Sequence, residues 1–144
     1  MLHRCPFPDV EAQILLCDSA QVADGKLFIL GGGWRQINVV GPFQFAVALR
    51  VITAWNETNT RHQFTLRILT PDGQVLLGPR GNPMFGMQGE FEVGRPPGTP
   101  HGAYQVNCLA VSLPPFLFET GTYEFRFEVG GETVGSEPFR VVRQ

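Results

Sequence analysis

The chain has 144 residues, of which 43% are hydrophobic and 17% are charged, and its formal net charge is −2. A chain of this length can bury roughly 70% of its unfolded surface around one core, so we expect residues 1–144 to form a single domain. No apolar run approaches the ~20 residues that cross a bilayer, which predicts no membrane insertion. The mild acidity removes the basic field that non-specific nucleic-acid binding needs, so no nucleic-acid partner is expected.

The first ten residues, MLHRCPFPDV, contain two prolines and no apolar segment typical of a secretory signal. We expect them to form a flexible N-terminal segment. The three cysteines Cys5, Cys17 and Cys108 are odd in number and form no C-x-x-C pair. This favours a reducing cytoplasm over a disulfide framework. A bridge between Cys17 and Cys108 stays open as an alternative to two buried thiols.

Apolar residues alternate with a period of two between scattered glycines and prolines, which predicts short strands along the whole chain. In chain order the expected strands cover residues 12–22, 26 to about 38, 43–51, 61–69, 84–93, 104–113 and 123–129, and a last strand contains Phe139 and Val141. In the third of these, we expect the positions that alternate with the core, including Ala46 and Ala48, to be mostly solvated. Residues 94–102 contain three prolines and predict a long loop.

About eight short strands without an amphipathic helical stripe predict an all-β, antiparallel β-sandwich. The pattern Phe118-x-x-Gly121-x-Tyr123 resembles the tyrosine corner of immunoglobulin-like sandwiches, in which a tyrosine hydroxyl bonds to the backbone just upstream. The expected fold is therefore an immunoglobulin-like sandwich.

The dipeptide Asp24-Gly25 lies between two apolar runs and predicts a two-residue hairpin turn. In that register opposite residues add to 49, so one face carries Ala20, Val22, Leu27 and Ile29. The other face carries Leu15, Cys17, Phe28 and Leu30, with Trp34 opposite Leu15 unless the three glycines introduce a bulge. Because both faces are apolar, we expect the second to be covered by the chain's own loops or by another chain. These last five residues are the interface candidates.

The run LLCDSAQVADGKLFILGGGW and the ending GTYEFRFEVGGE with PFRV resemble an uncharacterised bacterial family of small proteins with an LGGGW signature near the N-terminus. The resemblance spans most of the chain. It implies a bacterial, cytoplasmic origin, and because no activity is assigned to that family it adds no site residue.

The histidines do not indicate a catalytic triad. His62 falls at the start of a predicted strand, in register with its inward face, and is expected to be a half-buried structural residue. His101 lies in the proline-rich loop and His3 in the N-terminal segment. Ser19 beside Asp18 lacks the G-x-S-x-G turn that exposes a nucleophile. We therefore expect no enzymatic activity.

No metal or cofactor is expected either. The four aspartates are scattered singly, no zinc-ligand spacing occurs, and Glu90 and Glu92 form a solvated pair. The three glycines at 31–33 are followed by Trp34-Arg35, where a phosphate-binding loop needs Lys and then Ser or Thr. We expect them to form a bulge or a close backbone approach.

The sequence thus predicts a non-catalytic interaction or assembly module that binds a protein partner or associates with itself. The alternative is a carbohydrate- or small-ligand-binding sandwich that uses Trp55, Asn56 and Tyr104, and the exposure of Trp55 distinguishes the two.

Overall fold

The computed structural model describes residues 9–78 and 80–144. The strands of this described part are β1 (Val10–Cys17), β2 (Ser19–Ala23), β3 (Lys26–Leu30), β4 (Gln36–Val39), β5 (Ala46–Thr53), β6 (Arg61–Leu69), β7 (Gly86–Glu92), β8 (Gln105–Ser112), β9 (Gly121–Val129) and β10 (Glu132–Arg143). A single-turn helix, η1 (Trp55–Glu57), follows β5. The predicted flexible segment lies outside the described residues except for its last two, and Val10 already begins β1.

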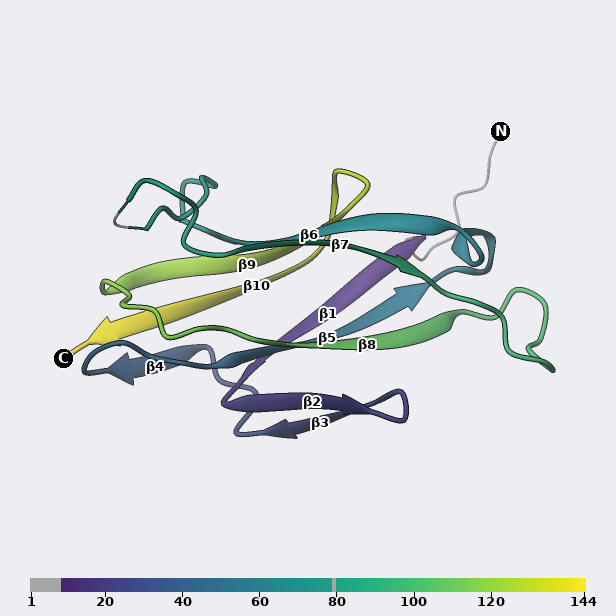
Figure 1. Ribbon diagram of the computed structural model, residues 1–144, viewed down its shortest axis with the longest axis horizontal. Coiled ribbons are helices and arrows are strands. Elements are labelled where there is room, and N and C mark those ends of the chain that lie inside the picture. Colours follow the sequence, from purple (N-terminus) through teal and green to yellow (C-terminus); the bar gives the residue numbers. More distant parts are fainter. Residues whose placement is uncertain (1–8, 79) are drawn as a thin grey trace.

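Two packed sheets make up the body of the molecule (Figure 1). One has the order β1-β5-β8, and the other has the order β4-β10-β9-β6-β7. All pairings are antiparallel except that of β4 with β10, which is parallel. The orders match strands A-B-E and G-F-C-C′ of an immunoglobulin-like sandwich. The predicted fold class is therefore confirmed.

The described part contains ten strands rather than about eight because two predicted strands are each divided. Segment 12–22 is interrupted at Asp18, so that β1 pairs with β5 while β2 pairs with β3. Segment 26–38 is interrupted at residues 31–35, which join β3 to β4. A period-two pattern does not show these breaks, because the apolar residues keep alternating on both sides of each.

The core lies between the inner faces of the two sheets and is rich in phenylalanine. Phe45 is at its centre, with ring centroids 6.1 Å from Phe118, 5.9 Å from Phe125 and 6.0 Å from Phe139. The apolar residues that alternate along β6 and β9, which the period of two places on one face of each strand, are buried: Phe64, Leu66, Ile68, Tyr123, Phe125, Phe127 and Val129. Alternation along each strand therefore identified most of this core.

The tyrosine corner is present at the start of β9. The Tyr123 hydroxyl donates a hydrogen bond to the backbone carbonyl of Glu119 at 2.6 Å, four residues upstream. The Tyr123 ring is 8% exposed and packs beside Phe118 and Phe139, with centroid distances of 5.4 and 5.6 Å. This contact ties the connection after β8 to the first residues of β9.

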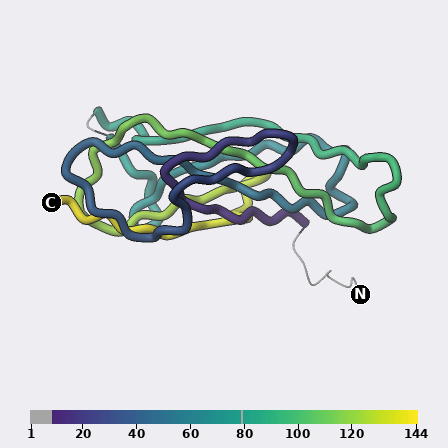
Figure 2. Tube along the Cα trace, turned by 90° about the horizontal axis from the view of Figure 1, so that it is seen from below, coloured from purple at the N-terminus to yellow at the C-terminus, as the bar shows by residue number. Residues whose placement is uncertain are grey.

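The β2–β3 hairpin forms a small third layer on the outer face of the β1-β5-β8 sheet (Figure 2). Ala20, Leu27 and Ile29 of the hairpin pack against Cys17, Ala46 and Ala48 of the sheet. The prediction that Ala46 and Ala48 are mostly solvated is therefore wrong, since they are 2% and 1% exposed. Small side chains at these positions let the hairpin approach the sheet closely.

The turn and the glycine run shape this layer as predicted. Asp24 and Gly25 both have positive φ angles, 52° and 69°, and β2 pairs with β3 in the register whose opposite residues add to 49. At the other end the Asp18 N–H donates to the carbonyls of both Leu30 (3.0 Å) and Gly31 (3.2 Å), as in a β-bulge. Gly31 has a φ of 62°, and a Cβ there would collide with the Asp18 carboxylate. The predicted bulge or close approach is confirmed.

Candidate functional site

The hairpin outer face is the side of β2–β3 that points away from the sandwich. It comprises Ser19, Gln21, Ala23, Lys26, Phe28 and Leu30, by alternation from the residues that pack inward. Phe28 is 56% exposed and Leu30 is 72% exposed. Among these six residues only Lys26 is charged. The outer face therefore carries two large apolar side chains, Phe28 and Leu30, that the described part of the chain leaves uncovered.

The interface candidates do not form one surface. Phe28 and Leu30 are on the hairpin outer face, whereas Cys17 is fully buried beneath the hairpin. Leu15 is 37% exposed and pairs with Ala48 of β5, so it does not lie opposite Trp34, and the stated exception of a bulge at the glycines applies. The bulge beside Gly31 is the reason, because strict alternation cannot be continued through it from β3 back to β1.

Trp34 lies at the margin of the core rather than on the hairpin. Its ring meets Phe43 and Phe45 edge-on, with centroid distances of 6.3 and 5.4 Å. The ring is half-buried. Trp34 thus fixes the segment between β3 and β4 to the sandwich.

Cys17 and Cys108 are free thiols, so the alternative of a bridge between them is not what the structure contains. The Cys17 thiol donates to the backbone carbonyl of Ala46 at 3.5 Å. Burial, together with the charge of the neighbouring Asp18, raises the pKa of the Cys17 thiol. A buried thiol held in the neutral form is a poor nucleophile and metal ligand. Cys5 lies outside the described residues.

The residues of the carbohydrate-binding alternative lie around η1 and the 94–102 loop. The Arg95 guanidinium carbon is 3.7 Å from the Trp55 ring centroid, and the His101 ring meets Trp55 edge-on at 4.8 Å. Arg95 also donates to the carbonyl of Trp55 at 2.8 Å. Trp55 is therefore half-buried, with one face covered by Arg95. These contacts give Trp55 a structural role, because they hold the 94–102 loop against η1.

The other two residues of that alternative do not extend a sugar-binding platform. Asn56 is exposed, and Tyr104 is half-buried immediately before β8. Because the Arg95 contact occupies one face of Trp55, the geometry favours the alternative less than the hairpin outer face. Carbohydrate binding stays a prediction.

The polar residues singled out in the sequence have structural contacts. The His62 Nε2–H donates a hydrogen bond to the Glu57 carbonyl at 2.8 Å, and the ring stacks on Phe91 at 5.1 Å, as expected of a half-buried structural histidine. Glu90 pairs with Arg61 at 3.7 Å on the exposed side of β7. In residues 9–78 and 80–144, no three metal-ligating side chains come together.

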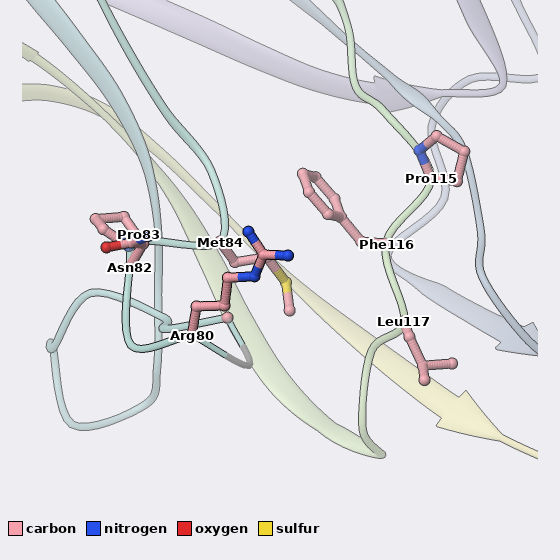
Figure 3. A pocket seen from close by; sticks show the side chains of 8 residues that line it. Arg80, Asn82, Pro83, Met84, Pro115, Phe116 and Leu117 are labelled. Carbon is pink, nitrogen blue, oxygen red and sulfur yellow. The ribbon is translucent and has the colours of Figure 1, made fainter.

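No sequence motif indicates the hollow that opens between residues 78 and 80–84 on one side and residues 115–117 on the other (Figure 3). Its two walls come from connections far apart in the chain, one before β7 and the other after β8. Only the pairing of the sandwich brings them to the same end of the molecule. The one local feature of the sequence that could have pointed to this hollow is a basic residue, Arg80, in an otherwise apolar and proline-rich segment.

Sheet order, the tyrosine corner and the added hairpin define the protein as an immunoglobulin-like β-sandwich with a small third layer. The chain belongs to a family of unknown function, DUF6941, whose model matches residues 12–142. No curated protein and no solved structure matches the chain. The family match agrees with the resemblance to an uncharacterised family.

Within the described residues there is no helix of the length and apolar character needed to cross a bilayer.

Proposed function

We propose that the protein is a non-catalytic interaction module that associates with a second copy of itself through the hairpin outer face. One observation supports this most directly: Phe28 and Leu30 are 56% and 72% exposed although the hairpin already packs Leu27 and Ile29 against its own chain. Large apolar side chains placed together on a surface are typical of interaction sites.

Within residues 9–78 and 80–144 the chain leaves Phe28 and Leu30 exposed. Two segments of the chain are candidates for covering this surface, the 94–102 loop and the N-terminal segment. The loop is fastened instead to Trp55 through Arg95 and His101. Residues 1–8 of the N-terminal segment lie outside the described residues. A second hairpin therefore provides the better cover.

Stacking two hairpin outer faces about a twofold axis would bury the same residues from both copies. Apolar area removed from water contributes about 25 cal/mol per Å², which offsets part of the cost of association. The two Lys26 side chains are long enough to stay in water at the rim. The expected complex is a symmetric homodimer that weakens on dilution.

The proposal includes a cytoplasmic location and, as the LGGGW resemblance implies, a bacterial origin. The free thiols Cys17 and Cys108 support a reducing compartment.

The test compares the mass in solution of the wild type, Phe28→Glu and Val40→Glu over a range of protein concentrations. Val40 is the matched control because it is 86% exposed but lies after β4, away from the hairpin. We expect a concentration-dependent dimer for the wild type and for Val40→Glu, and a monomer for Phe28→Glu. Denaturant unfolding should give Phe28→Glu monomers a stability close to that of wild-type monomers, because an exposed substitution removes little packing.

A wild type that stays monomeric at high micromolar concentration would refute self-association. So would a Phe28→Glu variant that loses stability without any change in mass, because that result would place Phe28 in an intrachain contact.

A further inference from the structure

The hollow between residues 78 and 80–84 on one side and residues 115–117 on the other has a volume of about 400 Å³. Pro83 and Met84 line one wall, and Pro115, Phe116 and Leu117 line the other. In Figure 3 the Phe116 ring points from its segment toward the side that carries Met84 and Arg80. This volume falls within the range of small-molecule sites, and the lining is mostly apolar, as in such sites.

Both walls are held in place by backbone hydrogen bonds, so the hollow exists before any ligand binds. On one side Gly78 donates to the Asn82 carbonyl at 2.7 Å, and Gly81 closes the turn with a φ of 78°. On the other side Phe43 and Phe116 exchange two backbone hydrogen bonds, of 2.8 and 3.0 Å. A preformed site does not have to order its loops when a ligand enters.

Arg80 lies at this hollow, and its guanidinium has no carboxylate partner in the described part of the chain. Five other arginines in the described part of the chain have carboxylate partners, for example Arg35 with Glu137 at 2.8 Å and Arg143 with Glu119 at 2.9 Å. The Arg80 side chain has neither a hydrogen bond nor an ion pair with any residue in the described part of the chain. In Figure 3 it extends from the turn toward Met84, so the guanidinium is at the apolar surface.

We propose that this hollow binds a small carboxylate with an apolar body. The body would lie against Met84, Phe116 and Leu117, and the carboxylate would accept two parallel hydrogen bonds from the Arg80 guanidinium. The exposed Asn82 amide, which also lines the hollow, offers a further donor. A single cation suits a monocarboxylate better than a multiply charged phosphate, since Arg80 is the only basic residue among the lining residues.

The size of the hollow limits the ligand. A volume of 400 Å³ equals that of about 13 water molecules at ~30 Å³ each, so a ligand of roughly a dozen non-hydrogen atoms would fill it. So small a ligand is expected to bind with a dissociation constant in the millimolar range.

The test uses 4-phenylbutanoate as the probe and its uncharged amide, 4-phenylbutanamide, as the matched compound. Titration of the ¹⁵N-labelled protein, followed by amide NMR shifts, gives both the affinity and the place of binding. We expect the acid to shift the backbone amides that line or flank the hollow, namely those of Gly78, Arg80, Gly81, Asn82, Met84, Phe116 and Leu117. The amide compound should bind about tenfold more weakly. Arg80→Gln should lower the affinity for the acid by about tenfold, whereas Arg140→Gln should leave it unchanged. Arg140 is exposed on β10 and does not line the hollow.

A second arm distinguishes the two sources of such a carboxylate. A short acetylated peptide ending in phenylalanine is titrated with a free and with an amidated C-terminus. Preference for the free C-terminus with loss in Arg80→Gln would support the same chemistry, supplied by a peptide. Equal binding of acid and amide, equal affinity in Arg80→Gln, or no shifts at these residues for any probe up to about 20 mM would overturn the proposal.

Discussion

Replacing Tyr123 by phenylalanine removes one hydroxyl and tests the tyrosine corner directly. The bond that is lost joins this hydroxyl to the Glu119 carbonyl at 2.6 Å. The phenylalanine ring can keep the packing against Phe118 and Phe139, whose centroids are 5.4 and 5.6 Å away. The free energy of unfolding should therefore fall by the net value of one hydrogen bond, about 1 kcal/mol.

This loss can be measured by urea unfolding, with an unchanged m-value showing that the compactness of the two states is preserved. In a domain of this size 1 kcal/mol corresponds to a decrease of about 3 °C in Tm. Tyr123→Ala is the comparison, because it also removes the ring from the core and should cost about 3–5 kcal/mol.

A Tyr123→Phe stability equal to that of the wild type would refute the argument that this hydroxyl stabilises the fold. A loss as large as that of Tyr123→Ala would also refute it, since the ring packing rather than the hydrogen bond would then have been disturbed.

Three other predictions concern the thiols, the bulge and pH. Cys17 should be alkylated only when the hairpin opens, and therefore more slowly than the partly exposed Cys108; equal rates would show that the hairpin does not protect Cys17. Gly31→Ala should lower the free energy of unfolding by at least about 1 kcal/mol, because Gly31 has a φ of 62°. Gly41→Ala is the control and should have little effect, since a Cβ added at residue 41 would meet no atom within 4 Å. Equal losses of the two variants in urea unfolding would contradict the bulge. Burial, followed by a nearby carboxylate charge, raises the pKa of Tyr123, so its stabilisation is complete below about pH 10 and is lost as pH rises through the raised folded-state pKa. The wild type should therefore lose stability above pH 10 more steeply than Tyr123→Phe, and parallel pH profiles would contradict this.

The local features of the fold follow from the sequence alone. Alternation identified the inward faces of β6 and β9, Asp24-Gly25 specified the hairpin turn and its register, and the Phe118-to-Tyr123 pattern specified the tyrosine corner. Each of these depends on residues close together in the chain, where backbone geometry and side-chain period leave few alternatives.

The tertiary structure decided which surfaces are covered. Ala46 and Ala48 alternate like solvated positions, yet they are buried because the hairpin folds over them. Cys17 and Phe28 were predicted to share one face of the hairpin, but they lie on different sides of a bulge. The hollow beside Arg80 likewise exists only because the sandwich brings two distant connections together. Period-two patterns describe one strand at a time, whereas exposure depends on what long-range packing places above that strand.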